Sequence, residues 1–82
     1  MPFFVYILYS MTYDRFYVGQ TQDINERLKR HNNGYEDATS PYIPWELRCC
    51  IEKENRSEAM ILERKLKNMN REKLWLFISK YG

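Results

Sequence analysis

The feature that most constrains the fold is a pair of aromatic, β-branched segments separated by only five residues. The first segment, residues 3–9, reads FFVYILY, and the second, residues 15–18, reads RFYV. Apolar runs of this length predict strands, and we expect the first to be buried on both faces. Because residues 10–14 are only long enough for a turn, the two strands should pair as an antiparallel hairpin. Gly19 follows, and we expect it to end the second strand.

A helix is predicted directly after the hairpin. Thr21 or Asp23 is suited to cap its N-terminus. Ile24 and Leu28 are four residues apart and give the helix an apolar edge. The run Asn32-Asn33-Gly34 is a strong signal for its C-terminal end.

A loop and a third strand come next. Residues 35–45 contain two prolines and predict the loop. Residues 45–53 alternate between apolar and charged side chains, which predicts a strand with Leu47, Cys49 and Ile51 on its inward face.

Two further helices complete the chain. Asn55 or Ser57 is expected to start the first of them, and Asn70 to open a short last helix over residues 71–79. The apolar stripe that should face the sheet consists of Ala59, Leu62, Leu66 and Met69. The order β-β-α-β-α-α predicts an α+β fold, a three-stranded antiparallel sheet with helices packed over it.

The length of 82 residues predicts one domain, residues 1–82. No apolar run approaches the roughly 20 residues that span a bilayer, and no secretory signal is visible, so no membrane partner is expected. Cys49 and Cys50 are adjacent, and a disulfide between them would close almost no loop. We therefore expect two reduced thiols on a strand and a cytoplasmic protein.

Positive charge is concentrated in the second half of the chain. The net charge is only +2, which says little about partners by itself. Residues 64–73, however, hold five basic side chains against one glutamate. This run is a candidate phosphate-facing patch, although a solvated helix surface is the simpler explanation of the run taken alone. The candidate nucleic-acid contacts are Lys29, Lys65, Lys67, Arg71 and Lys73.

Five residues have chemistry that packing does not require. Arg27 and His31 are four apart and share one helix face, although a surface cation and a helix-end histidine would explain them individually. Tyr6 and Tyr17 could be core aromatics, but a buried hydroxyl needs a partner. Glu63 lies at the rim of an apolar helix face, where a carboxylate needs a cation or an ion pair with Lys67.

The order and spacing of these residues resemble the GIY-YIG nuclease superfamily, in particular its small stand-alone bacterial domains. The resemblance rests on Tyr6 in the first strand, Tyr17-Val18-Gly19 in the second, Arg27-x-x-x-His31 on the next helix and Glu63 on a later one. It extends from about Phe4 to Lys67. The first motif departs from the family pattern, because Val5-Tyr6-Ile7 stands where Gly-Ile-Tyr is usual.

The resemblance implies metal-dependent cleavage of phosphodiester bonds in DNA. It implies that Tyr6, Tyr17, Arg27, His31 and Glu63 are catalytic and that Glu63 holds one Mg²⁺ or Mn²⁺. A site that binds Mg²⁺ through one carboxylate, water and substrate phosphate agrees with this, and a guanidinium suits phosphoryl oxygens. The general base stays open among Tyr6, Tyr17 and His31.

The leading hypothesis is therefore a DNA endonuclease with one divalent ion. The runner-up is a nucleic-acid-binding module of the same fold with weakened or lost catalysis. A third hypothesis, a small interaction domain, requires all five residues to coincide by chance. One small domain offers little area for reading bases. We therefore expect its selectivity to come from the structure of the DNA (branched or damaged, as in DNA repair), from dimerisation or from a protein partner.

Overall fold

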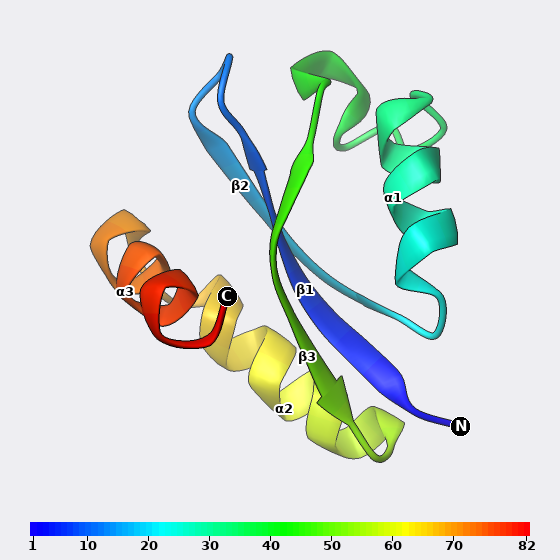
Figure 1. The fold of residues 1–82 in the computed structure, drawn as a ribbon, viewed down its shortest axis with the longest axis vertical. Helices are drawn as coiled ribbons and strands as arrows, with labels where there is room; N and C mark the ends of the chain where they lie inside the picture. The colour runs from blue at the N-terminus through cyan, green and yellow to red at the C-terminus, as the bar shows by residue number, and fades with distance from the viewer.

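The computed structural model describes residues 1–82, and it confirms the α+β class and the predicted order of elements. One antiparallel sheet has the strand order β2-β1-β3. The elements are β1 (Phe3–Ser10), β2 (Arg15–Thr21), α1 (Ile24–Asn32), the 3-10 turn η1 (Ser40–Tyr42), β3 (Glu46–Lys53), α2 (Arg56–Lys67) and α3 (Arg71–Tyr81). Figure 1 shows α1 on one side of the sheet and α2 and α3 on the other. None of these helices has both the length and the apolar character that a membrane span requires.

The middle strand β1 is covered on both faces, as the sequence predicts. Val5, Tyr6, Ile7 and Leu8 are all buried. Successive side chains of a strand point to opposite faces. Val5 and Ile7 therefore face α2 and α3, whereas Tyr6 and Leu8 face α1.

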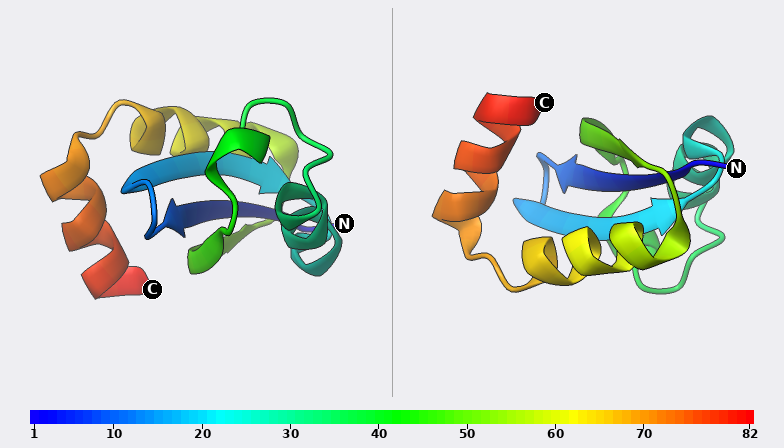
Figure 2. Two further views of the ribbon diagram at one scale, coloured as in Figure 1. Left: turned by 90° about the horizontal axis from the view of Figure 1, so that it is seen from above. Right: turned by 90° about the horizontal axis from the view of Figure 1, so that it is seen from below.

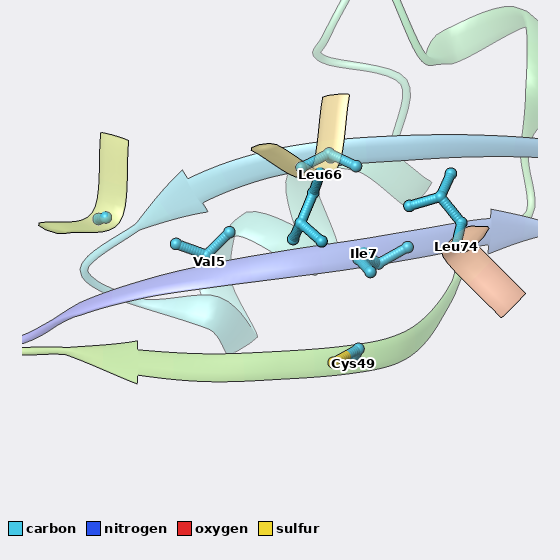
Figure 3. Close-up of a cluster of buried hydrophobic side chains, with 7 residues drawn as sticks. Val5, Ile7, Cys49, Leu66 and Leu74 are labelled. Carbon is cyan, nitrogen blue, oxygen red and sulfur yellow. The ribbon is translucent and has the colours of Figure 1, made fainter. Parts of the chain in front are cut away.

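The face toward α2 and α3 carries the apolar core. Figure 3 shows Leu66 of α2 and Leu74 of α3 reaching the sheet beside Val5 and Ile7. The buried cluster consists of Val5, Ile7, Val18, Cys49, Ala59, Leu66 and Leu74. Of the predicted stripe, Ala59 and Leu66 are buried, and Leu62 and Met69 pack against the cluster. This confirms the predicted apolar face of the helix.

The face toward α1 is aromatic and partly polar. Tyr6, Leu8 and Trp45 form its buried centre, and Ile24 and Leu28 of α1 pack against them. This second, smaller core holds α1 over the hydroxyl end of Tyr6. As a result, the polar side chains of His31 and Thr39 are buried inside the protein.

Each helix begins at a side-chain cap that the sequence offers. Asp23 rather than Thr21 caps α1, because its Oδ1 accepts from the Glu26 amide at 3.1 Å. Asn55 rather than Ser57 caps α2, and Asn70 caps α3, each accepting an amide hydrogen at 2.9 Å. Such caps satisfy amides that have no partner within the helix.

Two details of the sheet differ from the sequence prediction. Gly19 does not end β2, because the strand continues to Thr21 and Gly19 pairs with Tyr6. In β3 the register shifts, because Ile7 pairs with Cys49 while Leu8 pairs with Leu47. Such a bulge at Arg48 reverses the alternation, so Leu47 leaves the face of Cys49 and is exposed.

An ion pair and an aromatic cluster hold α3 against the hairpin. Arg71 donates to the Asp14 carboxylate at 2.6 Å and to the Asp14 carbonyl oxygen at 3.1 Å. Trp75 packs edge-on against Tyr9 and Phe16 of the two strands. The last helix is thereby fixed to the turn between β1 and β2.

Replacing Leu66 with alanine should destabilise the protein by about 2–5 kcal/mol, because it removes a fully buried side chain and leaves a cavity. Urea unfolding followed by circular dichroism measures this change. Leu76→Ala is the matched control, because Leu76 is exposed on α3, and it should cost far less. Equal losses in the two variants would contradict the packing described here.

Candidate active site

A chain of hydrogen bonds runs through the interior between β1 and the loop after α1. The Tyr6 hydroxyl lies 3.0 Å from His31 Nε2, and His31 Nδ1 lies 2.8 Å from Thr39 Oγ1. All three residues are about 1% exposed. Figure 1 shows α1 and the loop leading to β3 on the same side of the sheet, the side that Tyr6 of β1 faces.

The partners of this chain assign its proton positions. The Thr39 hydroxyl donates to the Glu36 carbonyl oxygen at 3.4 Å, so Thr39 Oγ1 is left to accept from His31 Nδ1. A neutral imidazole with its proton on Nδ1 has an acceptor at Nε2. Tyr6 therefore donates its hydroxyl hydrogen to His31.

The loop that supplies Thr39 is fixed to α1 and β3. The Asn32 side chain accepts from the Trp45 amide at 2.6 Å and donates to the Trp45 carbonyl oxygen at 3.0 Å. Trp45 Nε1 in turn donates to the Thr39 carbonyl oxygen at 2.9 Å. Asn32 and Trp45 thus hold Thr39 where His31 needs it.

Burial sets the ionisation of the two connected groups. Burial, assisted by Tyr17, raises the pKa of Tyr6 well above its usual value, and the charge of Arg27 opposes that rise. Burial lowers the pKa of His31, and the charges of Arg27 and Arg30 act in the same direction against Glu36. Both shifts favour the neutral phenol and the neutral imidazole that the hydrogen bonds require.

Tyr17 is the more accessible of the two tyrosines. Its ring centroid lies 5.0 Å from that of His31 and 6.3 Å from that of Tyr6. Tyr17 is half-buried, and no hydrogen bond to the protein holds its hydroxyl. Of the two phenols, Tyr17 is therefore the one open to a bound molecule.

Gly19 makes the close approach of these rings possible. A Cβ atom at this position would lie 2.6 Å from the Tyr6 hydroxyl oxygen and 3.1 Å from the Tyr17 ring. Any larger residue would displace one of the tyrosines. The glycine that the sequence suggested as a strand end thus serves a close approach within the strand.

Arg27 lies next to this cluster, and it lines a hollow at the edge of the sheet. The hollow has a volume of about 420 Å³, and its wall includes Arg27, Gln20 and Met60. Arg27 Nε is buried and has no hydrogen-bond partner. Arg27 therefore lies between the cluster on the α1 side of the sheet and the edge strand β2, whose Gln20 lines the same hollow.

Glu63 reaches the same edge from the other side of the sheet. Its Oε1 accepts from Gln20 Nε2 at 2.8 Å, and its Oε2 lies 3.0 Å from Lys67 Nζ. The ion pair with Lys67 is the alternative that the sequence offered for this glutamate. A second hollow of about 350 Å³ is lined by Glu63, Lys67 and again by Gln20 and Met60.

The five predicted residues therefore form two groups. Tyr6, Tyr17 and His31 are in mutual contact beneath α1, with Arg27 beside them, whereas Glu63 projects from α2. Figure 2 shows α2 running along β2, the edge strand. The two hollows share Gln20 and Met60, so they adjoin at the β2 edge. We call these two hollows together the groove; Arg27 lines its first hollow and Glu63 its second.

The oxygen donors at Glu63 would suit one divalent ion once Lys67 leaves the carboxylate. Gln20 Oε1 is buried without a partner, and it belongs to the same side chain that contacts the Glu63 carboxylate. Hard oxygen donors suit Mg²⁺ or Mn²⁺, and Mg²⁺ commonly takes only one or two carboxylates with water and substrate phosphate. The chain contains no group of three or more His, Cys, Asp or Glu side chains that would hold an ion by themselves.

The five basic residues do not gather on one patch. Lys67 lies in the groove, whereas Lys65 lies beside Lys53 and Ile61. Arg71 is paired with Asp14, and Lys73 borders an apolar depression on α3. Lys29 is exposed on α1. A run that is continuous in sequence is thus divided by the helix faces and by the turn between α2 and α3.

Sequence reasoning did not assign roles to Thr39, Gln20 or Arg56. Thr39 holds His31, Gln20 holds Glu63, and Arg56 lines the first hollow. Thr39 lies within residues 35–45, which the sequence predicts only as a loop. No sequence signal marks Gln20 or Arg56, since both roles arise from the packing of α2 along β2.

Comparisons with known proteins agree with this fold. A family model described as the GIY-YIG catalytic domain matches residues 2–75. The solution NMR structure of the UPF0213 protein BH0048 from Bacillus halodurans is similar over 100% of this chain and 87% of that one, with 30% identity and a TM-score of 0.65. A comparison with curated proteins gives no match.

The stability of the fold should fall when the pH drops below about 6.5, the usual pKa of an unfolded histidine. Because folding lowers the pKa of His31, the unfolded chain takes up a proton first, and stability declines until the pH reaches the folded pKa. His31 is the only histidine. Urea unfolding between pH 5 and 8 measures the effect.

His31→Gln is the control for this experiment, because an amide does not titrate in that range. Its pH dependence between 5 and 6.5 should be flatter than that of the unmodified protein. The same slope in both proteins would show that His31 is not the responsible group.

Proposed function

Since the chain belongs to the GIY-YIG catalytic-domain family, a family of nuclease type, we propose that it cleaves phosphodiester bonds in DNA with the help of one divalent ion. The single observation that carries the proposal is the groove at the β2 edge, which Arg27 lines in its first hollow and Glu63 in its second. The Arg27 guanidinium suits a phosphate, and the Glu63 carboxylate in the adjoining hollow suits the divalent ion that accompanies it.

Arg27 is proposed to bind the phosphate that is cleaved. The Arg27 Nε is buried without a hydrogen-bond partner. Because the guanidinium is planar and rigid, its position also fixes the directions of the remaining N–H donors. A fixed cation meets the negative charge that grows on the phosphoryl oxygens during the reaction, without reorganising at that moment. Arg27 would therefore stabilise the transition state more than the bound substrate.

Tyr17 is proposed to orient the attacking water. Its hydroxyl has no partner in the protein, whereas the Tyr6 hydroxyl is buried and donates to His31. A group that acts on water must come within hydrogen-bond distance of it. Tyr6, His31 and Thr39 are then positioning residues that keep the Tyr17 ring and the Arg27 side chain in place.

Glu63 and Gln20 are proposed to hold the divalent ion, Mg²⁺ or Mn²⁺. Such an ion supplies charge neutralisation and a more acidic bound water. Lys67 would have to leave Glu63 Oε2 first, and its ammonium would then be free to contact a phosphate oxygen. Gln20 keeps the carboxylate aimed at the groove in the meantime.

A second candidate function is binding of nucleic acid without cleavage. The observation in its favour is that both oxygens of Glu63 already have protein partners, Gln20 and Lys67. If Lys67 keeps its place, the groove still offers cations to a phosphate backbone. The two functions therefore differ in whether an ion can replace Lys67.

Branched or damaged DNA is the substrate form that we propose, because one small domain has little area for reading bases. A cytoplasmic location and a role in DNA repair belong to the same proposal, as do a protein partner or a dimer that adds selectivity.

Arg27→Ala should reduce cleavage by about 10²–10³-fold, the scale for one electrostatic group that acts in the transition state. DNA affinity should change much less. Glu63→Gln should abolish cleavage and also the shifts that Mg²⁺ or Mn²⁺ causes in nearby amide signals. The assay uses labelled duplex, single-stranded and branched DNA with each ion.

Lys80→Ala is the matched control, because Lys80 is an exposed cation on α3 outside the groove. It should cleave at the rate of the unmodified protein. Binding to the DNA panel with no cleavage under any ion would select the binding module. No binding even at low salt would contradict both functions.

A further inference from the structure

The first hollow of the groove contains two arginines and no acidic residue. Arg27 enters it from α1 and Arg56 from the start of α2. Neither guanidinium lies within ion-pair distance of a carboxylate. The full lining is Phe3, Gln20, Thr21, Gln22, Arg27, Arg56 and Met60.

This arrangement favours an anion, although Arg56 is exposed and is also hydrated by solvent. An arginine keeps its charge at any pH at which the protein is folded, and two like charges that share a hollow repel each other. Phe3 and Met60 add apolar surface to the wall, which hydrates charge poorly. The buried Arg27 Nε has a hydrogen and no acceptor for it.

Arg56 lines the hollow from the start of α2. It is the first residue of α2, directly after the Asn55 cap. Its guanidinium carbon lies 5.8 Å from the centre of the Phe3 ring, close enough for a cation–π interaction. This contact keeps the exposed Arg56 side chain beside Phe3 at the rim of the hollow.

We propose that the Arg56 end of this hollow is a second phosphate subsite, in which Arg56 binds the phosphate next to the one that Arg27 holds for cleavage. The inference rests on the proposed function, in which the cleaved phosphate lies between Arg27 and Glu63. The cleaved phosphate would then lie near Gln20 and Met60, because these two residues line both hollows. The neighbouring phosphate of the same strand then meets Arg56, and the Gln22 amide is a further donor beside it.

The subsite defines the smallest good substrate. A strand with successive phosphodiesters fills both positions, whereas a dinucleoside monophosphate has only the bond that is cleaved. The second contact contributes binding in the ground state and in the transition state alike. Its loss therefore raises KM and leaves kcat nearly unchanged.

The test compares Arg56→Ala with Lys80→Ala, which removes one exposed cation outside the groove. On an oligonucleotide, Arg56→Ala should raise KM several-fold at unchanged kcat, and on a dinucleoside monophosphate it should have no effect. DNA affinity measured without divalent ions gives a second readout. Its salt slope should fall by about 0.7–0.9 for the one lost phosphate contact, and Lys80→Ala should change neither quantity.

Inorganic phosphate tests the subsite without nucleic acid. In ¹⁵N NMR spectra, its titration should shift the Nε–H signals of Arg27 and Arg56 more than that of Arg15, which lies over Tyr42 at the hairpin. Equal shifts at all three would overturn the subsite.

The two proposals fail in different ways. If the unmodified protein cleaves DNA but Arg56→Ala behaves like Lys80→Ala, the subsite is wrong and the nuclease function stands. If the unmodified protein neither binds nor cleaves DNA, the proposed function is wrong, and so is the assignment of this hollow to a nucleic-acid phosphate.

Discussion

The buried hydrogen bond between Tyr6 and His31 is the interaction on which this side of the protein depends. It joins the middle strand to α1 and, through Thr39, to the loop before β3. A buried polar group without a partner is costly, so each member of the chain requires the others. Asn32 and Trp45 close the loop with hydrogen bonds between side chains and main-chain groups, from the Trp45 amide to Asn32 Oδ1 and from Trp45 Nε1 to the Thr39 carbonyl oxygen. Because α1 is fixed in this way, Arg27 is held at the sheet edge.

The edge strand β2 joins two sides of the sheet that would otherwise be separate. Its side chains alternate, so Tyr17 and Gly19 face α1 while Gln20 faces α2. Gln20 contacts Glu63 on one side and lines the hollow of Arg27 on the other. Residues on opposite faces can therefore act on one molecule that lies around the edge.

The order and type of the elements could be predicted from the sequence, whereas the contacts between them could not. Burial on both faces of β1, the asparagine caps and the stripe on α2 follow from local patterns, which the chain itself displays. The bulge at Arg48 does not, because it depends on how β3 pairs with β1. The role of Gln20 and the separation of Lys65 from Lys67 depend on how α2 packs. Gly19 was expected only to end the second strand, because the group that its missing side chain makes room for, the Tyr6 hydroxyl, is brought beside it by the pairing of β1 with β2.

The proton position on His31 tests the central claim most directly, because the connection of Tyr6 to Thr39 requires one tautomer. Long-range ¹⁵N NMR spectra of the imidazole at neutral pH distinguish the two ring nitrogens. The hydrogen bonds described here predict a neutral ring with its proton on Nδ1 and an acceptor at Nε2. A proton on Nε2, or a charged ring at neutral pH, would contradict the account.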